Sequence, residues 1–137
     1  MSSRRLAGHA VTVLGIVVLA MVGVLATSRP VALRTWARVA APSPQVIGCY
    51  LSGVDGTLVT DAEAGTAIVE DVGPGAGQRS AISWPAGYWG LSVLGTTVVF
   101  DGRGPLPVAR TGARLHIPGG FHDGSFEACF EGVGSLD

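Results

Sequence analysis

The chain has 137 residues, a length typical of a single domain, and a formal net charge of −1 at pH 7. The charge is unevenly distributed along the chain. The first 44 residues carry five arginines and no acid, whereas the remainder carries four arginines and ten acids. An acidic C-terminal part lacks the basic stripe that binding to phosphates requires. The composition therefore argues against a nucleic-acid partner.

The N-terminal residues are apolar enough to enter a membrane. Residues 10–26 carry no charge and follow Arg4 and Arg5. A helix rises about 1.5 Å per residue, so this run reaches about 25 Å, and Leu6–His9 extend it toward the roughly 30 Å of a hydrocarbon core. We expect a transmembrane signal-anchor over 10–26 after a cytoplasmic N-terminus at 1–9. A cleaved signal peptide stays open, because Val24-Leu25-Ala26 has the small-residue pattern of a cleavage site.

Residues 27–44 are expected to form a juxtamembrane, proline-rich linker. Trp36 lies between Arg34 and Arg38, and such a cluster suits the membrane interface. Pro42-Ser43-Pro44 cannot continue a helix and is typical of a semi-rigid spacer. An extracytoplasmic β domain is then expected over 45–137.

Two cysteines, Cys49 and Cys129, lie near the two ends of this expected domain. Their positions predict one disulfide, and a disulfide persists only in an oxidising compartment. We therefore expect the C-terminal domain outside the cytoplasm, either on a single-pass membrane protein or secreted after cleavage. Val46-Ile47-Gly48-Cys49 matches a lipobox only superficially, because it stands far beyond the apolar run.

From residue 45 onward, short runs of apolar and β-branched residues alternate with turn residues. This pattern predicts an all-β domain, either a small barrel or a two-sheet sandwich of short antiparallel strands. The expected strands are Ile47–Ser52, Thr57–Thr60, Thr66–Val72, Ser80–Ser83, Trp89–Leu94, Thr97–Asp101, Pro107–Thr111, Arg114–Ile117 and Phe126–Phe130.

Two hairpins are expected near the C-terminal end. Thr97–Phe100 should pair with Pro107–Thr111, and Pro107–Arg110 should pair with Arg114–Ile117 through a turn in which Gly112 takes a positive φ. Pro118-Gly119-Gly120 is expected to be a turn.

Alternation predicts which side chains of the last two strands are buried. Leu115 and Ile117 should face inward, with Arg114 and His116 in water. In the last strand Phe126, Ala128 and Phe130 share one face, which puts Cys129 on the other face with two acids. Either a bulge or a bridge on the outer rim would resolve this conflict.

Several short motifs resemble a loose group of small exported bacterial β-proteins with no assigned activity. They are the Gly48-Cys49 strand, the Trp84-Pro85-Ala86-Gly87-Tyr88 turn and the hairpin that ends at Gly119-Gly120, with a late Cys129. Ala113 departs from the acidic residue expected after the hairpin glycine. The resemblance implies an exported β domain and assigns no functional residue.

The sequence offers little for catalysis or metal binding. No nucleophile elbow occurs, and cysteines in a disulfide cannot supply a thiolate. His116, His122 and Asp123 fall around one glycine pair, but their spacing matches no recurrent zinc or calcium pattern. We expect a protein that is not an enzyme and that has no cofactor and no metal.

The aromatic turn carries the only candidate binding site, formed by Trp84, Tyr88 and Trp89. These rings would either cap the open end of a barrel or form an exposed ledge for a partner. Alternation should turn Tyr88 away from Trp89, and we expect Tyr88 on the exposed side, where its removal leaves the melting temperature nearly unchanged. The expected function is a membrane-tethered extracytoplasmic interaction or accessory module of the bacterial cell envelope with a protein partner. The alternative is a secreted β domain that binds a small ligand.

Overall fold

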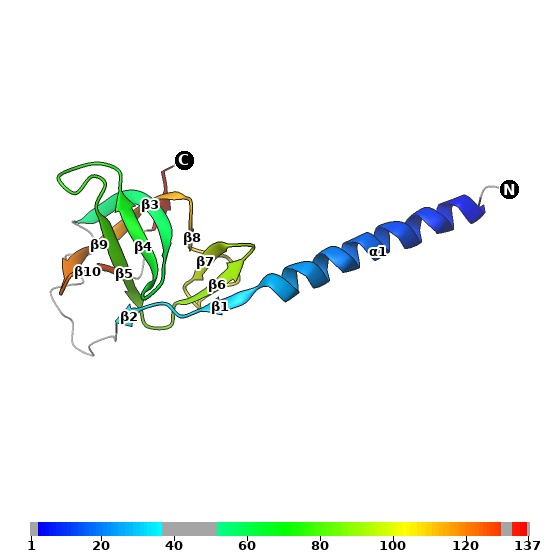
Figure 1. Cartoon of the computed structure of the whole chain (residues 1–137), viewed down its shortest axis with the longest axis horizontal. Coiled ribbons are helices and arrows are strands. Elements are labelled where there is room, and N and C mark those ends of the chain that lie inside the picture. Colours follow the sequence, from blue (N-terminus) through cyan, green and yellow to red (C-terminus); the bar gives the residue numbers. More distant parts are fainter. Residues whose placement is uncertain (1–2, 37–51, 130–132, 137) are drawn as a thin grey trace.

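A long helix and a β domain make up the molecule (Figure 1). The computed structural model describes residues 3–36, 52–129 and 133–136. Helix α1 (Ser3–Thr27) contains the predicted apolar run 10–26 and projects from one side of the β domain. The prediction that this run crosses a membrane gains no support here, since no helix in the described ranges combines the length and the apolarity of a membrane span.

The β domain contains short strands separated by turns, as the sequence predicts. The strands that the structure describes are β1 (Arg29–Val31), β2 (Thr35–Trp36), β3 (Gly53–Asp61), β4 (Gly65–Glu70), β5 (Arg79–Pro85), β6 (Trp89–Val93), β7 (Thr96–Phe100), β8 (Ala109–Arg110), β9 (Arg114–His122), β10 (Ser125–Ala128) and β11 (Gly134–Ser135). The expected strand Ile47–Ser52 lies almost wholly outside the described residues, and Ser52 itself precedes β3.

Five of these strands close into a mixed barrel. Strand β3 pairs with β4, β4 with β5, and β9 with both β3 and β10, all antiparallel. The parallel pair of β5 and β10 closes the ring. This order, with the third and fifth barrel strands as parallel neighbours, is that of OB-type Greek-key barrels. The all-β prediction is confirmed, and of its two open alternatives the structure has the small barrel. The prediction that all of its strands are antiparallel is wrong at the closing pair.

A second, antiparallel sheet has the order β1-β6-β7-β8. Strands β6 and β7 form a hairpin whose two-residue loop is Leu94-Gly95, with φ values of 51° and 82°. Two consecutive positive φ values are the mark of the type I′ turn, which matches the twist of paired strands. Leucine is an unusual choice for its first position, because a side chain with a Cβ is strained there.

The β domain begins well before the expected boundary at residue 45. Strand β1 pairs with β6 and strand β2 pairs in parallel with β5, so residues 29–36 are part of the two sheets. Leu33 packs against the core, and the Trp36 indole N–H donates to the Ala128 carbonyl at 3.1 Å. Residues 29–36 of the expected linker therefore belong to the folded β domain, and half-buried Trp36 lies against the barrel. Residues 37–44 of that linker lie outside the described ranges.

The predicted turn at Pro118-Gly119-Gly120 is wrong, because β9 continues through it. The first half of β9 pairs with β3 and its second half with β10, so the strand changes partner at these glycines. A Cβ on Gly119 would collide with the Glu127 carbonyl and would lie 2.8 Å from the Phe126 ring. The glycine therefore allows a close approach of two strands at a barrel corner.

The expected hairpin between β8 and β9 is also absent, although Gly112 has the predicted positive φ of 87°. Strand β8 pairs with β7, as predicted, while β9 belongs to the barrel. The turn at Thr111-Gly112-Ala113 thus carries the chain from one sheet to the other, and its backbone bonds to Leu58 of β3.

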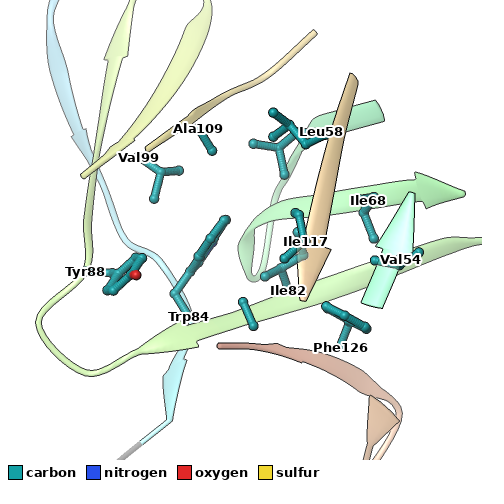
Figure 2. Packing of buried hydrophobic residues seen from close by; sticks show 12 residues of the cluster. Val54, Leu58, Ile68, Ile82, Trp84, Tyr88, Val99, Ala109, Ile117 and Phe126 are labelled. Carbon is teal, nitrogen blue, oxygen red and sulfur yellow. The ribbon is translucent and has the colours of Figure 1, made fainter. Parts of the chain in front are cut away.

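One core joins the barrel to the second sheet. Figure 2 shows Val99 and Ala109 of the second sheet facing Trp84 and the barrel residues Ile82 and Ile117. The inward positions predicted for the last two strands are confirmed where they are described, at Leu115, Ile117, Phe126 and Ala128.

Cys129 lies just past the end of β10 and is 3 % exposed, which removes the conflict in alternation. Its backbone N–H donates to the Pro118 carbonyl. Its predicted partner, Cys49, lies outside the described residues, as does Phe130, so the pairing itself stays a prediction.

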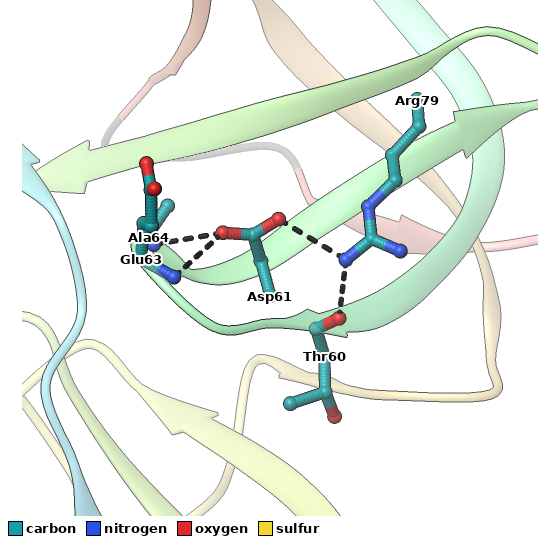
Figure 3. A network of polar contacts seen from close by, with 5 residues as sticks. All are labelled: Thr60, Asp61, Glu63, Ala64 and Arg79. Carbon is teal, nitrogen blue, oxygen red and sulfur yellow. Dashed lines mark hydrogen bonds and ion pairs between the residues drawn. The ribbon is translucent and has the colours of Figure 1, made fainter.

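Asp61 organises the turn between β3 and β4 (Figure 3). Its Oδ1 atom accepts hydrogen bonds from the backbone N–H groups of Ala64 at 2.9 Å and Glu63 at 3.0 Å. Its Oδ2 atom accepts one from Arg79 Nη2 at 3.0 Å. The bonds from Ala64 and Glu63, with a smaller contribution from Arg79, outweigh burial and lower the pKa of Asp61.

Candidate functional site

Trp84 belongs to the core. It is the second-last residue of strand β5 and is fully buried on the inner side of the barrel, and its indole N–H donates to the Thr66 hydroxyl at 2.8 Å. A buried indole with a satisfied N–H stabilises the fold and offers no surface to a partner. The aromatic turn was expected either to cap the barrel end or to form an exposed ledge. The burial of Trp84 agrees with the cap.

Tyr88 is buried as well, which corrects the expectation that it faces solvent. Its side chain is 7 % exposed, and its ring stacks on Trp84 with centroids 5.6 Å apart and planes 16° apart (Figure 2). The turn after Pro85 contains Gly87 at a φ of 94° and returns Tyr88 to the core. Alternation correctly predicts that Tyr88 and Trp89 point to opposite sides, but the buried side is that of Tyr88.

Trp89 is the one member of the predicted ledge with a large exposed area, at 47 %. It stands directly opposite Phe100 in the β6–β7 hairpin. The two rings stack with centroids 4.2 Å apart and planes 11° apart. This stacked pair lies on the side of the second sheet that faces away from the barrel.

Further apolar residues share this side with Trp89. In β7, Thr97 and Val99 are buried against the barrel, whereas the residues that alternate with them are half-buried and face outward. The residues of β6 directly opposite these outward residues lie on the same face, and so does the β1 residue paired with Leu91. We call this surface the outer face; its apolar residues are Pro30, Trp89, Leu91, Val93, Val98 and Phe100. Sequence reasoning found only Trp89, although the alternation of Trp89, Leu91 and Val93 carries the signal.

Leu94 extends the outer face at the tip of the hairpin. It is 72 % exposed and follows Val93 directly. Because Arg29 pairs with Ser92, the tip lies beside the C-terminal end of α1, which contacts β6. The tip of the outer face thus lies near the end of the helix, whose side chains from Val13 to Ala26 are exposed.

Charge is distributed unevenly over the β domain. Among the described residues, the segments that form or border the second sheet (29–34 and 89–113) carry four arginines and one acid. The barrel segments (53–85 and 114–128) carry two arginines and seven acids. The two barrel arginines form ion pairs with barrel acids, Arg79 with Asp61 and Arg114 with Asp71. The positive charge therefore lies at the end of the domain that bears α1.

His116 and His122 have separate acidic partners. His116 Nδ1 lies 2.6 Å from Asp55 Oδ1 on the neighbouring strand, and His122 Nε2 lies 3.2 Å from Asp123 Oδ2 beyond the corner of β9. Both pairs are exposed to solvent. No cluster of three metal-ligating side chains occurs in the residues that the structure describes.

The fold and the outer face define a mostly β protein, with a five-strand mixed barrel, a second antiparallel sheet and an N-terminal helix. Comparisons with family models, with curated proteins and with solved structures find no match. The resemblance to small exported bacterial β-proteins accordingly stays a prediction, and so does the absence of enzymatic activity.

Proposed function

We propose that this protein is a membrane-tethered module of the cell envelope, with α1 as the tether and the β domain outside the cytoplasm. One observation carries the proposal: from Val13 to Ala26 the helix is uncharged and its side chains are exposed. Apolar area in water costs roughly 25 cal/mol per Å², so these side chains require apolar surroundings. No described helix qualifies as a span, and insertion of α1 as a single-pass anchor is the part of the proposal that experiment must decide.

The end of α1 favours a tether that stays attached to the domain. The Thr27 hydroxyl donates to the Gly23 and Val24 carbonyls, and the Ser28 hydroxyl donates to the Leu25 carbonyl. The predicted cleavage point after Ala26 therefore lies within a hydrogen-bonded helical turn. Proteases commonly bind their substrates as extended strands, so cleavage would first require this turn to open.

The disulfide predicted between Cys49 and Cys129 is part of the proposal, because such bonds persist in oxidising spaces and are rare in the cytoplasm. An envelope protein partner remains part of the proposal. The aromatic ledge predicted for that partner is reduced to Trp89, since Trp84 and Tyr88 are buried.

Membrane fractionation of the full chain tests the tether. We expect the chain to stay in bacterial membranes through an alkaline carbonate wash, with an intact mass that includes residues 1–26. Leu19→Arg places a charge at a position that is 74 % exposed and should release the chain, whereas the matched control Leu19→Ala should not. Release of the wild-type chain, or a mass that lacks the helix, would refute the tether.

A further inference from the structure

We propose that the outer face of the second sheet, together with Leu94 at the hairpin tip, docks on the surface of the bilayer that holds α1. This inference rests on the proposed tether and goes beyond it, because an anchored domain could equally stand clear of the lipid. The occupant of the face is a bilayer with anionic headgroups.

The connection between α1 and the β domain holds the hairpin-tip end of the outer face beside the end of the helix, and Trp89 lies at the other end of β6. Only Ser28 separates the helix from β1, and β1 is paired with β6 over its whole length. The β6–β7 hairpin is thus attached through strand pairing to the point where the helix ends. In Figure 1 the hairpin of β6 and β7 lies beside this end of the helix, and the barrel lies beyond it.

Leu94 has an unfavourable backbone conformation and an unfavourable side-chain environment. At a φ of 51° its backbone adopts a conformation that asparagine and glycine accept more readily, and its side chain is 72 % exposed. In water, a leucine at this position gains nothing for its strained backbone or its exposed side chain. A leucine is favourable there if its side chain enters the acyl boundary of a bilayer.

The composition of the face suits the membrane interface. The stacked Trp89 and Phe100 rings supply the large aromatic area that is enriched at headgroup level. Arg110 lies opposite Val98 and is exposed on the outer face itself, and two further exposed arginines border the face, Arg29 at the start of edge strand β1 and Arg103 in the loop after β7. Basic residues near a membrane surface are attracted to anionic lipids, whereas the acidic barrel is repelled and should point away.

Quenching of tryptophan fluorescence by brominated lipids tests the docking. The full chain is reconstituted in phosphatidylcholine–phosphatidylglycerol vesicles with or without bromine on the acyl chains. Subtracting the emission of Trp89→Phe isolates Trp89 and keeps an aromatic ring against Phe100. We expect bromine to lower the Trp89 emission at least twofold. Phe121 is 60 % exposed on the barrel strand β9, so Phe121→Trp in the Trp89→Phe background is the matched control and should not be quenched.

Leu94→Asn separates docking from a structural role of the side chain. Asparagine tolerates the positive φ, so we expect the thermal midpoint of the variant in detergent to rise by a few degrees. In vesicles the same variant should lose at least half of the Trp89 quenching. A lower midpoint with unchanged quenching would show that Leu94 serves the fold alone and would overturn its role in docking.

The remaining outcomes distinguish this inference from the tether. A chain that resists carbonate but whose Trp89 is not quenched overturns the docking and leaves the tether intact. If the unquenched Trp89 is also shielded from aqueous iodide, a second copy or another protein covers the face, and the docking falls as well. A chain that is washed from the vesicles overturns both.

Discussion

At the scale of single residues, neighbours in sequence take opposite roles in the aromatic turn. Tyr88 packs in the core against Trp84, and Trp89 lies on the surface against Phe100. The difference arises because Pro85 ends β5 and Gly87 allows the reversal that points Tyr88 inward. Sequence alternation could establish the opposition but could not establish which side was buried, since that depends on where the second sheet packs.

Removal of the Tyr88 ring should therefore destabilise the domain. Tyr88→Ala leaves a cavity beside Trp84, and we expect the free energy of unfolding to fall by about 3 kcal/mol. Trp89→Ala removes a larger but half-exposed ring and should cost about 1 kcal/mol. Urea denaturation of the full chain in detergent, followed by circular dichroism, measures both. Equal losses would contradict the burial of Tyr88.

Asp61 should make stability depend on pH. Its folded pKa lies below the ordinary value of 3.8, so ionised Asp61 stabilises the fold above that pH, and this contribution is lost as the pH falls through the folded pKa. Asp61→Asn keeps the shape but cannot ionise. We expect the variant to be about 1 kcal/mol less stable than the wild type near neutral pH, with the difference shrinking below about pH 4.

The control for Asp61 is Glu63→Gln, which removes a neighbouring charge but keeps the backbone N–H that donates to Asp61. Its curve of stability against pH should follow the wild type. If Asp61→Asn instead stays equally destabilised at every pH, the contribution of the turn does not come from the ionised carboxylate.

At the scale of elements, the strand runs and several turns are predictable because alternation and turn residues are local signals. Gly112 has the positive φ predicted for it, and the β6–β7 loop falls between the expected strands Trp89–Leu94 and Thr97–Asp101, although Leu94 belongs to the loop and not to the strand. The corner of β9 is not predictable in this way, because glycines serve both in turns and where two strands approach closely. Only the position of Phe126 and Glu127 against Gly119 distinguishes the two uses, and those residues arrive from another strand.

The two glycines of the corner should respond differently to a methyl group. In Gly119→Ala the Cβ meets the Glu127 carbonyl and the Phe126 ring, so we expect a loss of about 3 kcal/mol in the free energy of unfolding. In Gly120→Ala the added Cβ has no atom within 4 Å, and the cost should stay within about 0.5 kcal/mol. Urea midpoints of the two variants decide the matter, and similar midpoints would contradict the close approach at Gly119.

At the scale of the whole molecule, the division of charge is visible in the sequence, but its placement is not. The counts divide a basic N-terminal part from an acidic remainder, whereas the structure groups Arg29 and Arg110 of the second sheet with Arg103 of the loop between β7 and β8. The N-terminal residues 29–36 were expected in a linker because Trp36 between two arginines suits a membrane interface and the Pro42-Ser43-Pro44 tract that follows is typical of a spacer. Their strands form through pairing with β6 and β5, a tertiary effect that short-range patterns do not contain.

The barrel cannot close during synthesis until its last strand has been made. Strand β10 is the last of the five barrel strands in the chain, and it pairs with both β5 and β9. Until β10 emerges, β5 and the end of β9 have unpaired backbone edges, and the growing chain is an open sheet that can pair with other chains. The helix is made first and the closing strand late, so an exported chain would complete its barrel only after most of it had left the ribosome. Folding of this domain should consequently be limited by the long-range contact between β5 and β10.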